Sequence, residues 1–147
     1  MSLDKAIGAG SVRLSKKITR FINHQLKPYQ ITTEQWSVLR TLSESDQITQ
    51  KELSERADKD QATLTKILDL LEKHLLIERV PNPNDRRSFL IAITSKGKRL
   101  SQEVAPYLND IYKKLIRSID EEKLTIYQEV MLSLEKQIDI LFQEQNN

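Results

Sequence analysis

The chain has 147 residues, of which 38% are hydrophobic and 30% are charged, and its formal net charge is +2. This balance predicts a globular protein, and the length suits a single domain. The absence of cysteine excludes disulfides and cysteine-based sensing of oxidants. No run of about 18 apolar residues could cross a membrane, and the first ten residues lack the apolar core of a signal peptide. We therefore expect a cytoplasmic protein with no membrane partner.

Two helices are predicted in the first third of the chain. Pro28 marks the end of the first, because proline cannot continue a helix. Thr33 is the predicted N-cap of the second. Both segments repeat apolar residues at helical spacing. The first carries Ile7, Leu14, Ile18, Phe21, Ile22 and Leu26, and the second carries Trp36, Val38, Leu39 and Leu42.

A helix-turn-helix is predicted next. A short helix over 50–57 places Leu53 and Ala57 one turn apart, and 58–60 interrupts its pattern. Asp60 is a favourable N-cap for a second helix that starts at Gln61. Two helices joined by so short a turn cross steeply, which leaves the outer face of the second helix free to enter a DNA groove. The second helix has an apolar stripe of Leu64, Ile67, Leu68, Leu71 and Leu75, and an opposite face of Gln61, Thr63, Lys66, Asp69 and Lys73.

A β-hairpin with a charged tip is predicted directly after this helix. Its strands are the apolar runs 76–80 and 89–93, and the proline, asparagine and aspartate residues of 81–87 are typical of a turn. Residues 79–99 include six cations and one acid, which is a larger excess than the net charge of the whole chain. A phosphate backbone or a narrow minor groove would attract this concentration of charge. The cations are Arg79, Arg86, Arg87, Lys96, Lys98 and Arg99, and the acid is Asp85.

Two further helices are predicted after the hairpin. Thr94 is expected to cap a long helical segment that passes Pro106, and Asp120 precedes two glutamates in an acidic first turn of the last helix. The last helix repeats apolar residues at alternating spacings of four and three, as in a coiled-coil seam. The long segment carries Leu100, Val104, Leu108, Ile111, Leu115 and Ile119, and the last helix carries Tyr127, Met131, Leu134, Ile138 and Leu141.

The apolar stripes of the terminal segments have no obvious partner within a monomer. We therefore expect a homodimer, in which two copies cover these stripes. A dimer would also place two reading helices on half-sites about one turn of DNA apart. The alternative is that the two terminal segments close an intramolecular bundle. The residues expected at the dimer interface are Ile7, Leu14, Leu115, Ile119, Tyr127, Met131, Leu134, Ile138 and Leu141.

The helix ATLTKILDLLEKHLLIER and the following PNPNDRRSFLIAITSKG combine several specific features. Together they resemble the MarR family of winged helix-turn-helix regulators. Family members typically have a capped helix with paired threonines, a Leu-Glu-Lys run ending in Leu-Val/Ile-x-Arg, a Pro-x-Asp-x-Arg wing and a Leu/Ile-Thr-x-x-Gly start to the next helix. The similarity covers nearly the whole chain. The matching residues are Thr63, Thr65, Leu71, Glu72, Lys73, Leu76, Arg79, Asp85, Arg87, Thr94 and Gly97.

One position departs from the family pattern. Leu75 stands where the family usually has a glycine after the recognition helix. A leucine is strained in the left-handed conformation that this glycine adopts. We therefore expect the helix to end differently, so the family match alone does not determine the angle of the wing.

The resemblance implies a fold that is mainly α with a small β-hairpin wing. Residues 1–147 would form a single MarR-like domain, in which a winged helix-turn-helix lobe at 32–99 is flanked by dimerisation helices at 4–27 and 100–145. The implied function is a transcriptional regulator that binds double-stranded DNA sequence-specifically, as a homodimer on an inverted-repeat operator. The resemblance further implies a repressor that a small-molecule effector releases. The alternative is a winged-helix module that binds another protein and has no affinity for DNA.

Two groups of residues are expected to contact DNA. In the wing, Asp85 would shape the tip and orient Arg87 toward the minor groove. Leu70 leans toward the exposed side of the second helix, where it would pack on the wing or touch a thymine methyl group. The major-groove helix would contribute Gln61, Ala62, Thr63, Thr65 and Lys66, and the wing would contribute Asp85, Arg86 and Arg87.

The resemblance also implies a cleft for a small anionic or aromatic effector. Arg20 and His24 lie one helical turn apart, so they can face the same space. Phe21 lies beside them in sequence, and Trp36 belongs to the next helix. These four residues are the candidates for the cleft. The alternative is an aromatic core around Trp36 with two surface cations.

Neither catalysis nor a bound cofactor or metal is predicted. The only histidines are His24 and His74, and the chain has no glycine-rich phosphate loop. Two isolated histidines without cysteine do not have the spacing of a metal site. We therefore expect a binding protein rather than an enzyme.

Overall fold

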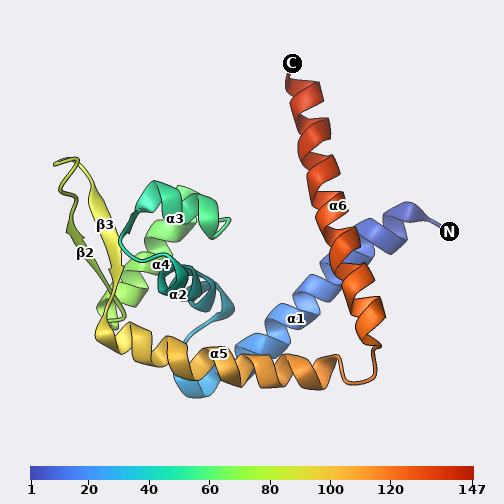
Figure 1. Ribbon diagram of the computed structural model, residues 1–147, viewed down its shortest axis with the longest axis horizontal. Helices are drawn as coiled ribbons and strands as arrows, with labels where there is room; N and C mark the ends of the chain where they lie inside the picture. The colour runs from blue at the N-terminus through green and yellow to red at the C-terminus, as the bar shows by residue number, and fades with distance from the viewer. The chain divides into compact units, whose positions relative to one another are not determined.

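The computed structural model describes residues 1–147 as two compact units, Met1–Leu108 and Asn109–Asn147. The chain is mainly helical and includes a small antiparallel sheet, which confirms the predicted fold class (Figure 1). No helix is both long and apolar enough to cross a lipid bilayer. In chain order the elements are η1 (Asp4–Ala9), α1 (Gly10–Leu26), η2 (Lys27–Tyr29), α2 (Thr33–Glu44), β1 (Ile48–Thr49), α3 (Gln50–Arg56), α4 (Gln61–Lys73), β2 (Ile77–Pro81), β3 (Phe89–Ile93), α5 (Ser95–Leu115) and α6 (Glu121–Asn146).

The start of α2 is held by a reciprocal capping box. Thr32 Oγ1 accepts a hydrogen bond from Gln35 N at 3.2 Å, and Gln35 Oε1 accepts one from Thr32 N at 3.0 Å. The predicted N-cap, Thr33, was therefore wrong by one residue, because Gln35 completes the box only with Thr32. The N–H of Thr33 instead donates to Asn23 Oδ1 at 2.8 Å, which ties the start of α2 to α1.

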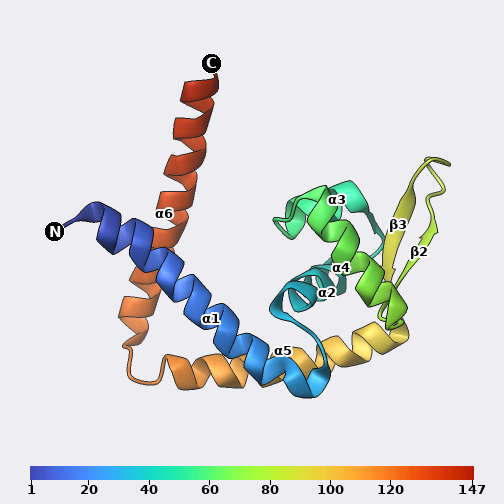
Figure 2. The same ribbon diagram turned by 180° about the vertical axis from the view of Figure 1, so that it is seen from behind.

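The helix-turn-helix is confirmed, and each of its helices begins at a side-chain cap. Thr49 Oγ1 accepts from Glu52 N at the start of α3, and Asp60 Oδ1 accepts from Thr63 N at the start of α4. Between the two helices, Asp58 has a φ of 52°, a left-handed conformation that aspartate tolerates better than most residues. The two caps and this turn make α3 and α4 cross at a short connection (Figure 2).

The core of the first unit lies where α2, α3, α4 and the sheet meet. Leu64 and Leu68 of α4 are fully buried, as are Leu39 of α2 and Leu53 of α3. Burial of one such leucine stabilises the fold by about 1.5 to 3 kcal/mol. The apolar stripe predicted for α4 is thus confirmed except at its last member, Leu75, which is 67% exposed.

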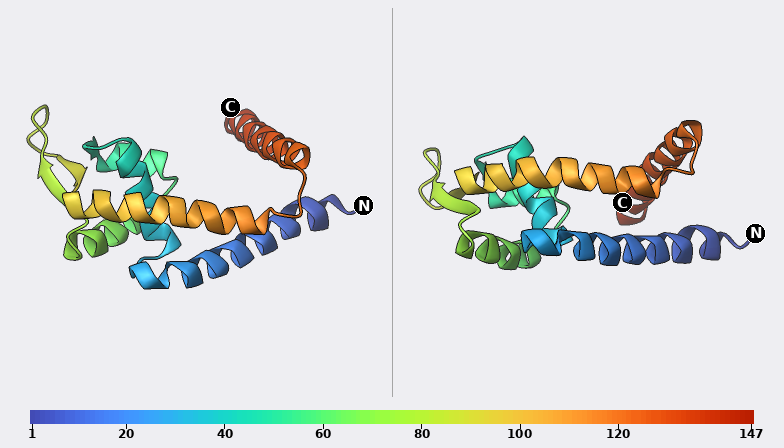
Figure 3. Two further views of the ribbon diagram at one scale, coloured as in Figure 1. Left: turned by 60° about the horizontal axis from the view of Figure 1, so that its bottom comes forward. Right: turned by 90° about the horizontal axis from the view of Figure 1, so that it is seen from below.

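The sheet has the strand order β1-β3-β2, and both pairs are antiparallel. In the predicted hairpin, Ile77 pairs with Ile93 and Pro81 pairs with Phe89. The short strand β1 adds Ile48 opposite Ile91 on the other edge of β3. The strand β3 lies between its two neighbours, and its last three residues are buried. The hairpin tip, by contrast, extends away from the helices of the lobe (Figures 1 and 3).

The end of α4 differs from the sequence prediction. Leu75 adopts the left-handed conformation, with a φ of 62°. Its N–H donates to Glu72 O at 3.0 Å, and Leu76 N donates to Leu71 O at 2.9 Å, which is the bond pattern of a Schellman motif. The expectation that the helix would end differently because glycine is missing was therefore wrong. A left-handed leucine is strained, and the hydrogen bonds of the motif, together with the burial of Leu71 and Leu76, keep Leu75 in this conformation.

The first turn of α5 secures this junction. Thr94 Oγ1 accepts from Gly97 N at 3.0 Å, so Thr94 caps α5 as predicted, and it donates to Leu75 O at 2.7 Å. Lys96 Nζ donates to His74 O at 2.9 Å. At Gly97 a Cβ would lie 2.2 Å from Leu76 O, so only glycine allows the helix to approach so closely.

α5 continues through Pro106, and its residues Val104 and Leu108 are buried. Tyr107 belongs to the same helix and reaches the N-terminal segment, where its hydroxyl donates to Gln25 O at 2.9 Å. Its ring meets that of Tyr29 edge-on at 5.2 Å. In the second unit, α6 begins directly after Asp120 as predicted, and none of its residues is buried.

Candidate nucleic-acid interface

The outer face of α4 begins with polar side chains on its first two turns. Gln61, Ala62, Thr65 and Lys66 are exposed, because the leucine stripe of the helix is directed into the core. Leu70 continues this face and is 45% exposed. The major groove of DNA is wide enough to admit an α-helix that presents such an exposed face.

Thr63 differs from the other predicted contact residues of α4. It is half-buried, and its hydroxyl donates to Asp60 Oδ2 at 2.9 Å. The backbone N–H of Thr63, followed by its hydroxyl, lowers the pKa of the Asp60 carboxyl below its ordinary value. The hydroxyl hydrogen of Thr63 is therefore used in the helix cap.

Thr65 is also occupied within the protein. Its hydroxyl donates to Gln61 O at 2.9 Å and accepts from Gln50 Nε2 at 2.8 Å. The second bond joins α3 to α4. Gln50 was not among the predicted contact residues, although its place directly after the cap Thr49 could have drawn attention to it.

The wing tip is shaped by its own side chains. Asp85 Oδ1 accepts from Arg87 N at 2.9 Å, and the Arg87 Nε lies 3.6 Å from the same oxygen. Asn82 Nδ2 donates to Ser88 Oγ at 2.9 Å across the base of the tip. Both Arg86 and Arg87 are exposed, and the Arg87 side chain is 93% accessible to solvent.

Arg79 does not belong with the free cations of the wing. Its guanidinium binds Glu72 Oε1 at 2.8 Å and Asp69 Oδ1 at 2.9 Å, and its side chain is only 23% exposed. Counting Arg79 as a charge available to DNA was therefore wrong, because two carboxylates of α4 neutralise it. The pair of bonds instead fastens β2 to α4.

A cleft of about 340 Å³ separates the helix-turn-helix from the base of the wing. Gln50, Lys51 and Gln61 line its helical side, and Phe89, which is 57% exposed, lies on the strand side. The sequence prediction missed Gln50, Lys51 and Phe89 as residues of this face.

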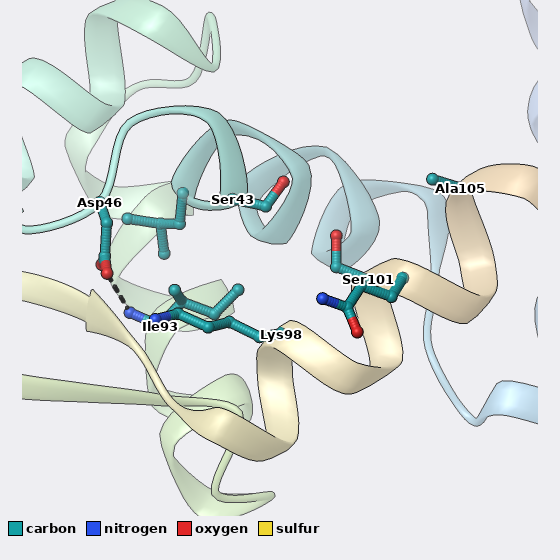
Figure 4. A pocket seen from close by; sticks show the side chains of 8 residues that line it. Ser43, Asp46, Ile93, Lys98, Ser101 and Ala105 are labelled. Carbon is teal, nitrogen blue, oxygen red and sulfur yellow. Dashed lines mark hydrogen bonds between the residues drawn. The ribbon is translucent and has the colours of Figure 1, made fainter.

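The four candidate effector residues differ in their exposure to solvent. Arg20, Phe21 and His24 are exposed on α1, whereas Trp36 is only 5% exposed and belongs to the core. A cleft of about 490 Å³, which none of these four residues lines, lies between the C-terminal end of α2 and the first half of α5 (Figure 4). Its lining includes Lys98, and Asp46 Oδ1 accepts from Ile93 N at 2.9 Å at its edge.

Comparison with known proteins identifies the family of this chain. Residues 31–89 match the model of the MarR family. The multiple antibiotic resistance protein MarR of Escherichia coli is 30% identical over 112 residues, which cover 76% of this chain and 78% of that protein. The chain belongs to the MarR family.

A wider set of relatives agrees with this MarR-family assignment. The regulator FarR of Neisseria gonorrhoeae is 26% identical over 136 residues, covering 92% of this chain and 93% of FarR. A crystal structure of mutant E. coli MarR in complex with operator DNA has a TM-score of 0.82 and 26% identity, and covers 91% of this chain and 98% of that one. This MarR-family chain is a DNA-binding transcriptional regulator, and proteins of the family are not enzymes.

The apolar stripes of this MarR-family chain lie on its surface. All nine residues predicted at a dimer interface are exposed, between 37% for Leu134 and 51% for Ile138. In the stretch from α2 to β3, by contrast, only Leu70, Leu75 and Phe89 are large exposed hydrophobic residues.

Proposed function

We propose that this MarR-family regulator binds an inverted-repeat operator as a homodimer, with α4 in the major groove and the wing on the adjacent backbone or minor groove. The observation that carries the proposal is the exposed face of Gln61, Ala62, Thr65 and Lys66 in the same lobe as the wing tip. Lys66 is exposed and forms no ion pair within the protein, so its charge is free for a guanine edge or a phosphate. Thr63 contributes by holding the cap that starts this helix.

The homodimer is supported by the exposed apolar stripes of η1, α1 and the C-terminal helices. A row such as Tyr127, Met131, Leu134 and Ile138 on α6 is costly to leave in water. A second copy would cover it, and proteins of the MarR family dimerise. In this proposal the dimerisation helices are 4–27 and 100–145, and the lobe at 32–99 carries the DNA contacts.

Repression, and its relief by an effector, are also part of the proposal. Arg20 and His24 are exposed one helical turn apart on α1, with Phe21 beside them. This combination suits a small anionic or aromatic molecule, which a guanidinium, an imidazole and a ring face could bind together. Trp36 would support such a site from the core rather than touch the ligand. The setting we propose is the cytoplasm.

The wing provides the sharpest test of DNA binding. Arg86→Ala combined with Arg87→Ala should weaken binding to the DNA that flanks the coding sequence, measured by fluorescence anisotropy at several salt concentrations. The slope of log affinity against log salt should become shallower by about 0.9 for each phosphate that the variant no longer neutralises. Melting of the double variant should be unchanged, since exposed charges contribute little to folding.

Lys113→Ala combined with Lys114→Ala is a matched control, because it removes two cations at the end of α5, outside the lobe at 32–99. It should retain the wild-type slope. If the wing variant also keeps the wild-type affinity and slope, the wing does not bind DNA. A wild-type protein with no DNA affinity would favour the protein-interaction module.

A further inference from the structure

In the hydrogen bond between Gln50 and Thr65, the other bond of the Thr65 hydroxyl determines which residue is the donor. A hydroxyl group has one hydrogen, and Thr65 donates it to Gln61 O at 2.9 Å, as helical threonines do toward the preceding turn. Gln50 must therefore supply the hydrogen of the second bond, at 2.8 Å. The amide nitrogen of Gln50 faces Thr65, and its oxygen faces the other way.

This orientation leaves Gln50 with one N–H and its Oε1 free. Neither group bonds to another residue of the protein. Gln50 borders the cleft of about 340 Å³ between the helix-turn-helix and the wing, together with Lys51 and Gln61. One amide N–H beside one carbonyl oxygen is the pattern with which glutamine binds the N7 and N6 groups of adenine in the major groove.

Thr65 lacks the hydrogen that such a contact requires. Its only hydroxyl hydrogen is bound to the backbone, so toward a base it offers a methyl group and an acceptor. Gln50, on the other helix, does project a donor and an acceptor toward this part of the surface.

We propose that Gln50, the first residue of α3, reads an adenine in each half-site, and that Thr65 is a positioning residue that orients its amide. This assignment rests on the proposed function, in which α4 lies in the major groove. It places a specificity-determining residue outside the recognition helix, and its ligand is the major-groove edge of an A·T pair.

The experiment selects binding sites from a random duplex library of roughly 20 base pairs, which spans two half-sites. The wild-type protein is compared with Gln50→Ala and Gln50→Glu, and the affinity for each single-base variant of the selected site is then measured. Gln50→Ala should lose the preference for adenine at one position per half-site, by roughly tenfold to a hundredfold, and keep the preferences at other positions.

Gln50→Glu gives a different expected result. A carboxylate has no hydrogen for adenine N7 but accepts one from cytosine N4. The preference at that single position should therefore change from adenine to cytosine. A merely structural role for Gln50 would not exchange one base for another.

Two matched substitutions of Thr65 test the positioning role. Thr65→Ser keeps the hydroxyl and should keep the adenine preference, whereas Thr65→Val keeps the shape and the methyl group but should reduce the preference. All variants should melt close to the wild-type temperature, because Thr65 is exposed and Gln50 is only half-buried.

Specific results would overturn the inference. Gln50→Ala and Gln50→Glu proteins that select the wild-type site with wild-type affinity would exclude Gln50 as a reader. A Thr65→Val protein with the wild-type preference would exclude the positioning role. If the wild-type dimer selects no common sequence, the proposed function fails together with this inference, whereas a site that is selected independently of Gln50 removes the inference alone.

Discussion

The winged helix-turn-helix lobe and the terminal helices use their apolar residues in opposite ways. From α2 to β3 most leucines and isoleucines are buried against one another, and Leu39, Leu53, Leu64 and Leu68 have no exposed surface. None of the residues of α6 is buried, although its apolar residues are as regularly spaced. The lobe is thus stabilised by its own core, whereas in the proposed homodimer α6 would be stabilised by a partner surface. Mutations in the lobe should therefore lower the stability of the fold, whereas mutations in α6 should weaken the dimer.

The largest effect is expected in the core of the lobe. Leu68→Ala removes a fully buried side chain and should lower the free energy of unfolding by roughly 2 to 5 kcal/mol. Leu70→Ala, two residues away and 45% exposed, is the matched control and should cost less than about 1 kcal/mol. Urea denaturation of both variants measures the difference. Equal destabilisation would contradict the assignment of α4's inner and outer faces.

The next effect concerns assembly. Ile138→Glu places a charge in the α6 stripe and should weaken the dimer at least about a hundredfold, which corresponds to roughly 3 kcal/mol. Sedimentation at several concentrations measures this, and operator binding should be abolished with the second half-site. Gln137→Glu adds the same charge at the neighbouring residue and should remain dimeric. A wild-type chain that is a monomer at micromolar concentration would refute the proposed dimer.

A smaller effect is expected where the wing joins α4. Arg79→Ala leaves Asp69 and Glu72 without their shared partner, and because these groups are partly exposed the decrease in stability should be about 1 kcal/mol. DNA affinity should fall as well, although Arg79 itself is not a DNA contact in this proposal. Arg79→Lys is the control, since one ammonium cannot replace the two-pronged guanidinium and should recover only part of the stability and the affinity. Wild-type stability and affinity in Arg79→Ala would show that the wing does not need this link.

The smallest expected effect is an increase in the stability of the lobe. Leu75→Gly removes the strain of a φ of 62° and should stabilise the lobe by about 0.5 to 1 kcal/mol, because the side chain that it removes is mostly exposed. Leu75→Ala keeps the Cβ, and with it the strain, so it should bring no such gain. The measurement is the thermal unfolding of the lobe. A lower stability in Leu75→Gly would mean that the leucine side chain makes a contact that outweighs its backbone strain.

Much of the fold could be predicted because it depends on neighbours in the chain. The stripe of α4, the cap at Asp60 and the turn residues of the wing all act over three to four residues, and the structure confirms them. The same local information placed Gln61 and Lys66 on an exposed face. The error at Thr33 was of the same local kind, because two adjacent threonines compete for one cap and only a side chain three residues on decides between them.

The helix-turn-helix, the hairpin and the amphipathic terminal helices could all be predicted from the sequence, because periodicity and capping are local properties of the chain. Three other features depend on tertiary contacts: α4 neutralises Arg79, Gln50 bonds to Thr65, and β1 pairs with β3. These contacts join residues that are 7 to 43 positions apart, and no local rule selects such partners. The left-handed Leu75 belongs with them, because its strain is tolerated only where Leu71, Thr94 and Lys96 hold the end of α4.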